Sequence, residues 1–246
     1  MIYYQKYKLS KREWTINILG IAVLLIMIAL LFYDNLLITV FLLPLGWGIL
    51  KYRQKYYKQQ RLWVLNVQFK EAINCLNTAL GAGYSIENAI DIAINDLHLL
   101  YEENSLIIQE FVYIKYQLSM NQTVEQAFLS FASRTGLEDI QNFADVFASG
   151  KRTGGNLIEI INRTSRIISD KHEIQQQIKT LVSAKRLEGK IMSVVPMVFI
   201  FYIWISSPGF IESLYHNVFG YIVMSVLLII YAGSYLLMQK IMNIEI

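Results

Sequence analysis

The sequence predicts an all-α membrane protein with four transmembrane helices and a cytoplasmic six-helix bundle of up-and-down, antiparallel topology. The chain has 246 residues and is 54% hydrophobic, and its mean hydropathy of +0.37 is too high for an ordinary soluble domain of this size. The apolar residues concentrate in residues 16–50 and 191–238, whereas the segment between them has the mixed charge of a soluble protein. One soluble domain between two membrane regions is therefore expected.

Residues 1–15 are expected to form a cytoplasmic N-terminal segment, and residues 16–50 a transmembrane hairpin of two helices. A single helix over this apolar stretch would measure about 52 Å, against a hydrocarbon core of about 30 Å. Asp34 and Asn35 suit a turn, and an aspartate at mid-membrane would be costly. The stretch is also longer than the core of a signal peptide, so we interpret it as an uncleaved anchor.

Residues 51–190 are predicted to be the cytoplasmic domain. Its first eleven residues, Lys51–Arg61, hold five basic residues and no acidic one. The positive-inside rule therefore places the N-terminus and this domain in the cytoplasm. These basic residues and their neighbouring tyrosines are typical of an interfacial belt; a specific anionic-lipid or nucleic-acid site is the alternative, and nucleic acid is not an expected partner.

Apolar periodicity predicts six helices in the domain, at about residues 62–80, 86–97, 105–119, 123–135, 137–149 and 157–186. Glycines and capping residues mark their ends. Gly81 and Gly83 follow the first helix, and Gly136 follows the fourth. The predicted N-caps are Ser85, Thr123 and, after Gly154 and Gly155, Asn156. Thr123 with Gln126 and Asn156 with Glu159 have the spacing of capping boxes.

The C-terminal part is expected to return to the membrane. Residues 191–207, with Pro196, are predicted as the third span and 220–238 as the fourth. Residues 208–219 form the external loop between them, and 239–246 a cytoplasmic tail. Both termini are then in the cytoplasm. The spans hold no ionisable residue at their centres, which disfavours an ion-coupled transporter.

No catalytic set, cofactor site or metal site is predicted, and the chain is not expected to be an enzyme. The segment from Gly150 to Gly155 resembles a phosphate-binding loop only in part, because Asp145 stands where the first glycine belongs and a helix precedes it. We interpret it as a helix–helix turn with Lys151 and Arg152 exposed. Asp139, Asp145 and Glu159 are candidate cation ligands, but carboxylates on solvated helix faces are commoner.

Seven features in a fixed order resemble the type II secretion system F-domain family, in particular its tight-adherence (Tad, or Flp) pilus branch, the TadB/TadC-like proteins. The resemblance covers residues 60–240 approximately. The features are the segments Phe69–Ile90, Asn121–Phe128, Arg134–Ile140, Gly154–Leu157 and Ser183–Lys185, then Pro196, then Ser207–Phe210.

The resemblance implies a multi-pass platform protein of the bacterial cytoplasmic (inner) membrane. Its bundle would meet a hexameric secretion ATPase, and its spans, in the lipid bilayer, would guide pilin subunits into a filament. A single F domain implies a second F-domain protein or self-association. The candidate interaction residues or structural turns are Gly81, Gly83, Ser85, Thr123, Gly136, Lys151, Arg152, Gly154, Gly155, Asn156 and Pro196.

An alternative function is a membrane-tethered adaptor or signalling protein whose bundle binds an unrelated cytosolic partner. The two differ in their expected genomic neighbours, because a platform protein should be encoded beside a secretion ATPase, pilin-like proteins and a prepilin peptidase.

Overall fold

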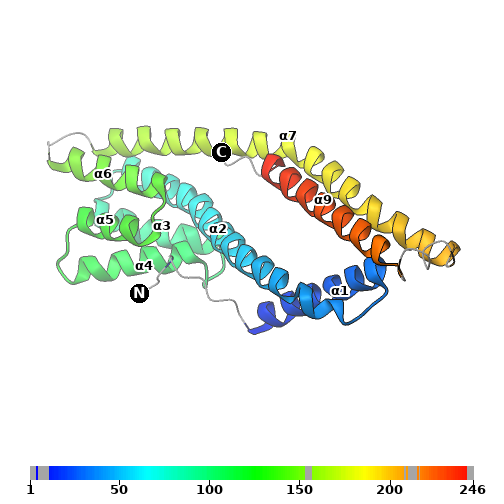
Figure 1. Cartoon of the computed structure of the whole chain (residues 1–246). Helices are drawn as coiled ribbons and strands as arrows, with labels where there is room; N and C mark the ends of the chain where they lie inside the picture. The colour runs from blue at the N-terminus through cyan, green and yellow to red at the C-terminus, as the bar shows by residue number, and fades with distance from the viewer. Residues whose placement is uncertain are drawn as a thin grey trace. The chain divides into compact units, whose positions relative to one another are not determined.

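The structure is a computed structural model that describes Tyr4 and residues 11–152, 157–207, 209, 215 and 217–242. Within these residues the fold is all-helical, as predicted, and contains no strand. The helices, shown in Figure 1, are α1 (Lys11–Tyr33), α2 (Ile38–Gly81), α3 (Ile86–Leu100), α4 (Leu106–Ser119), α5 (Val124–Thr135), α6 (Glu138–Arg152), α7 (Leu157–Ser206) and α9 (Val218–Met242).

The chain divides into two compact units. The helical unit comprises Met1–Lys8 and Gln54–Ile174, and the membrane unit comprises Leu9–Arg53 and Gln175–Ile246. Helices α2 and α7 each contribute to both units. The predicted helix break between Leu50 and Leu62 is wrong, because α2 runs through this stretch as one helix. Residues 51–61 contain no glycine or proline that would end a helix.

The same difference occurs in α7, which joins the predicted sixth bundle helix to the predicted third span. Its interior contains Gly189 and Pro196. A glycine costs a helix only about 1 kcal/mol relative to alanine, so it need not end one. Proline is tolerated in membrane helices, where neighbouring groups satisfy the freed backbone carbonyl.

Six phenylalanines fill the core of the helical unit. Phe128 lies at the centre of this group, with its ring centroid 5.0 Å from that of Phe143, 5.7 Å from Phe147 and 6.3 Å from Phe111. Phe69 of α2 contacts the rings of Phe131 and Phe143 edge-on. Edge-to-face packing of this kind adds about 0.5–1.5 kcal/mol per pair beyond area burial. The cluster therefore holds α2, α4, α5 and α6 together.

The predicted caps of α3 and α5 are confirmed. Ser85 is the N-cap of α3 and accepts a hydrogen bond from the backbone of Asn88. Thr123 and Gln126 form the predicted capping box of α5. Gly136 ends α5 with φ +66°, and Gly83, in the α2–α3 turn, has φ +90°. Both angles are left-handed, a region that glycine enters without the Cβ clash of other residues.

Helix α6 ends three residues later than predicted, at Arg152. The predicted turn at Gly150, Lys151 and Arg152 is therefore wrong for these residues, which form the last turn of α6. Gly150 is buried, and a Cβ added to it would overlap the Cδ1 atom of Ile160. The missing side chain at Gly150 thus allows α6 to pass close to α7.

Three described helices are long and apolar enough to cross a membrane, and they are α1, α7 and α9. Sequence analysis predicts a fourth span in the N-terminal part of α2. There, Ile38–Leu50 provides only about 20 Å of helix before Lys51, short of the roughly 30 Å hydrocarbon core. Asp34, with φ +46°, and Asn35 form the predicted turn between α1 and α2.

Polar contacts and close packing connect the helices within the membrane unit. Arg53 donates to the buried amide oxygen of Asn17, which links α2 to α1. A Cβ on Gly46 of α2 would lie 3.2 Å from Ile21 of α1, so the glycine permits close packing there. Tyr231 of α9 donates to the backbone oxygen of Ser193 in α7 at 2.6 Å.

We expect Gly136→Ala to destabilise the helical unit, because alanine in the left-handed region costs about 1 kcal/mol. The measurement is thermal unfolding of the purified chain in detergent. Gly81→Ala is the matched control, since Gly81 has no left-handed φ and no atom within 4 Å of its added Cβ. An equal decrease in thermal stability for the two variants would contradict a specific requirement for glycine at position 136.

Candidate functional site

The connection between α5 and α6 carries two charged side chains that point into the helical unit. Arg134 lies in the last turn of α5 and Asp139 in the first turn of α6. They are part of the segment Arg134–Ile140. Sequence analysis gives Asp139 as a candidate cation ligand and assigns Arg134 no role of its own. Each makes its main contacts with a residue distant in sequence. We call Arg134, Asp139 and their partners the polar turn network.

Arg134 forms a bidentate ion pair with Glu110 of α4. Its Nη1 donates to Oε1 at 2.8 Å and its Nη2 to Oε2 at 2.5 Å. Glu110 is 1% exposed. The guanidinium also lies 4.9 Å from the ring centroid of Tyr113, and its Nε donates to the backbone oxygen of Ser130. This fork geometry fixes the register of α4 against α5, because two parallel hydrogen bonds admit one orientation.

Tyr4, close to the N-terminus, joins the same ion pair. Its hydroxyl donates to Oε1 of Glu110 at 2.8 Å, and the side chain is 3% exposed. The Arg61 guanidinium lies 5.6 Å from the centroid of its ring. Burial, together with the negative charge of Glu110, raises the pKa of the Tyr4 phenol far above its ordinary value. Tyr4 is therefore a neutral donor in any physiological buffer.

Asp139 connects α6 to α2 and α7. Its Oδ1 accepts from Lys171 of α7 at 2.6 Å and its Oδ2 from the amide of Asn66 of α2 at 2.7 Å. At 5% exposed it is buried, so its predicted place on a solvated helix face is wrong. The prediction holds for Asp145 and Glu159, which are exposed. Among the described residues, no cluster of three or more His, Cys, Asp or Glu side chains could hold a metal ion.

His172 lies beside this carboxylate without a hydrogen bond to it. Its Nε2 is 3.8 Å from Oδ2 of Asp139 and has no hydrogen-bond partner among the residues that the structure describes. Asn66 likewise has a buried, unpaired Oδ1. The polar turn network thus retains unsatisfied polar atoms on its Asp139 side, whereas Glu110 has both carboxylate oxygens hydrogen-bonded.

The predicted residues Thr123 and Lys151 come together around Glu125. Lys151 of α6 pairs with the carboxylate of Glu125 in the first turn of α5, at 2.9 Å. Burial opposes ionisation of Glu125, but hydrogen bonds from its own backbone, from Lys151 and from Thr123 outweigh it and hold its pKa below the ordinary value. Arg152 is exposed at the end of α6. This end of the unit thus presents one paired and one exposed basic side chain.

The other predicted residues lie at separate places. Gly81, Gly83 and Ser85 form the exposed α2–α3 turn, and Gly136 lies in the α5–α6 connection. Gly154, Gly155 and Asn156, with the capping box predicted for Asn156 and Glu159, lie outside the described residues. Pro196 lies within α7 and is exposed.

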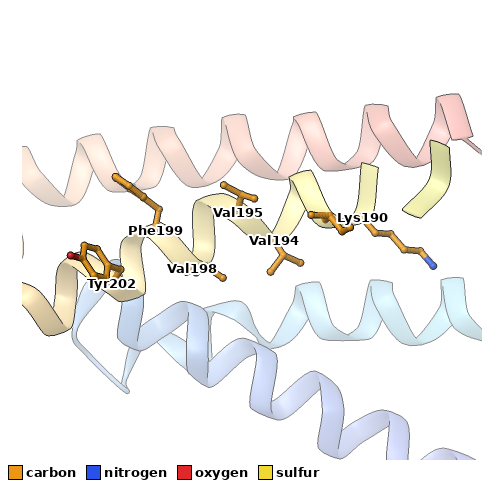
Figure 2. Close-up of a pocket in the computed structure, with 7 residues that line it drawn as sticks. Lys190, Val194, Val195, Val198, Phe199 and Tyr202 are labelled. Carbon is orange, nitrogen blue, oxygen red and sulfur yellow. The ribbon is translucent and has the colours of Figure 1, made fainter. Parts of the chain in front are cut away.

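An apolar groove of about 640 Å³ follows one side of α7 near Pro196. Its lining is aliphatic and aromatic apart from the two ends, where Lys190 and Tyr202 stand. Figure 2 shows Val195 and Phe199 directed toward the α9 ribbon, and Val194 and Val198 directed away from it. All of these side chains are at least partly exposed. The groove offers van der Waals contact and no directed polar group.

Sequence reasoning misses Tyr4, Glu110 and the buried role of Asp139. For Glu110 a signal exists: it stands three residues after Ile107 and four before Ile114, on the apolar stripe of α4. A charged residue on a buried stripe requires a partner. The partners Arg134 and Tyr4 are 24 and 106 residues away, and no local pattern identifies them.

We expect Glu110→Gln to destabilise the helical unit by about 3 kcal/mol, since breaking a buried pair leaves the other charge uncompensated. Chemical denaturation of the purified chain in detergent measures this. Asp91→Asn is the matched control, because Asp91 pairs with Lys115 at 2.9 Å on the exposed surface, where a pair contributes about 0–1 kcal/mol. A loss no larger than that of Asp91→Asn would show that the buried pair is not a main stabilising contact.

Comparison with known proteins identifies a family whose model matches more than half of the chain. The family model described as "Type II secretion system (T2SS), protein F" matches residues 72–205. The match begins in α2 within the helical unit and ends one residue before the end of α7. Neither the search of curated proteins nor that of solved structures gave a match.

Proposed function

Because the chain belongs to the type II secretion system protein F family, we propose that it is an integral membrane platform protein of a Tad-like or type IV pilus or of a type II secretion machine. In this role it couples a cytoplasmic secretion ATPase to extraction of pilin subunits and filament assembly. The observation that carries the proposal is the extent of the family match. Residues 72–205 include most of the helical unit and the apolar C-terminal part of α7.

The proposed topology has four spans and a cytoplasmic six-helix up-and-down bundle, with both termini in the cytoplasm of a bacterium. The segments are 1–15, 16–50, 51–190, 191–207, 208–219, 220–238 and 239–246, as the sequence predicts. The contact of Tyr4 with Glu110 supports a common side for the N-terminus and the bundle. The short second span requires local thinning of the bilayer, at a modest cost per ångström of mismatch.

The membrane helices provide the proposed surface for pilin subunits. A pilin helix leaving the bilayer exchanges lipid contacts for protein contacts, so a holding surface should be apolar and able to pack closely. The α7 groove satisfies the first condition. Gly20, Gly48 and Gly233 have no atom within 4 Å of an added Cβ and so satisfy the second, whereas Gly46 is used against α1.

The end of α6 provides the proposed surface for the ATPase. Lys151 and Arg152 project from it, and a basic side chain there suits an acidic partner surface. Because proteins of this family are structural components of a secretion machine, no catalytic role is proposed for this chain. A single F domain further suggests a second F-domain protein, or a second copy, in the assembly.

Lys151→Glu tests the ATPase surface. Reversing this charge should lower crosslinking of the chain to the secretion ATPase in cells several-fold or more, since placing like charges together at an interface is unfavourable. Lys115→Glu is the matched control: Lys115 also pairs with one carboxylate at 2.9 Å, on α4. The readouts are the crosslinked fraction and filament assembly, normalised to the membrane level of each variant.

Three outcomes are informative. A lower crosslinked fraction with Lys151→Glu but not with Lys115→Glu supports the end of α6 as the ATPase-binding surface. An equal decrease of the crosslinked fraction with both variants points to general charge or folding effects and removes the argument for this surface. Wild-type crosslinking and piliation with Lys151→Glu would place the ATPase elsewhere on the helical unit.

A further inference from the structure

Tyr4 occupies a pocket that the helical unit builds from three helices. Arg61 comes from α2, Glu110 from α4 and Arg134 from α5. Tyr4 itself belongs to no helix, yet it is 3% exposed and packs in the same hydrophobic cluster as the core phenylalanines. A buried hydroxyl group requires a hydrogen-bond partner, and Glu110 provides it.

The contacts have the character of ligand recognition. The phenol reaches a carboxylate that is already paired with Arg134, and Oε1 of Glu110 accepts from both. A hydrogen bond to an ionised acceptor is stronger than a neutral one. The Arg61 guanidinium lies over the ring face, where a cation is attracted by the ring quadrupole. Hydroxyl and ring face are each contacted by a charged group, which suits tyrosine better than any other residue.

We propose that this pocket is a docking site for a tyrosine side chain, occupied reversibly by Tyr4 of the same chain. Docking shields the Glu110–Arg134 pair from water. Release of Tyr4 exposes a tyrosine-binding pocket on the helical unit, with Glu110 and Arg134 at its base. Covalent connection favours the chain's own tyrosine, because a tethered ligand competes at an effective concentration in the millimolar range. The inference concerns Tyr4 and its pocket and does not rest on the platform function.

Docking of Tyr4 in this pocket should lower the chemical reactivity of its phenol ring. We would nitrate the full-length chain in detergent with tetranitromethane and follow each tyrosine by mass spectrometry. Tyr84 and Tyr116, which are 51% and 54% exposed, serve as references. Docked Tyr4 should react at least about tenfold more slowly than the references, since only the open state is attacked. Equal reactivity of Tyr4 and Tyr84 would overturn the proposal.

A variant pair tests the pocket itself. Arg61→Gln removes the cation over the ring and should raise the nitration rate of Tyr4 several-fold, with Tyr84 unchanged. Lys58→Gln, three residues earlier on α2, should leave both rates unchanged. No change of the Tyr4 rate in Arg61→Gln would count against recognition by this pocket.

Competition distinguishes the possible occupants. A peptide of residues 1–10 at several millimolar should accelerate nitration of Tyr4 in the isotope-labelled chain, and the same peptide with Tyr4→Ala should not. No acceleration would mean that Tyr4 is a fixed core residue, which overturns the proposal. Protection should survive about tenfold dilution of the chain, because an intramolecular contact does not depend on concentration. Loss of protection on dilution would assign the occupying tyrosine to a second copy and overturn docking within one chain.

Discussion

The buried ion pair between Glu110 and Arg134 is the contact on which the helical unit most depends. Neither charge is stable in an apolar interior by itself, so each fixes the position of the other. The pair joins α4 to α5, and Asp139 at the start of α6 joins the same turn to α2 and α7. The polar contacts at the two ends of the α5–α6 connection thus fix the register of five helices, α2, α4, α5, α6 and α7.

The membrane unit is held by different means. Its helices pack through small residues and a few tyrosine hydroxyl groups, as at Gly46 and at Tyr231 with Ser193. Packing of this kind constrains the arrangement of helices less than the buried, paired charges of the helical unit do. This contrast is consistent with the proposed platform function, in which the helical unit binds an ATPase and the apolar helices contact pilin subunits in turn.

Local features of this fold could be predicted from sequence, and long-range ones could not. The caps at Ser85 and Thr123 and the left-handed Gly136 depend on the nearest few residues, so their patterns identify them. The continuity of α2 escapes prediction because a change from apolar to basic composition resembles a helix boundary, although composition alone ends no helix. The buried roles of Glu110, Asp139 and Tyr4 depend on partners between 24 and 106 residues away, and a single sequence does not encode such pairing visibly.

The most direct test of the platform function is the identity of the proteins bound to the chain in its native membrane. The tagged chain would be crosslinked in cells, solubilised gently and analysed by mass spectrometry. A platform protein should recover a hexameric secretion ATPase together with a second F-domain protein or further copies of this chain. Recovery of another cytosolic partner, with the ATPase and any second F-domain protein absent from the crosslinked sample, would contradict the platform function.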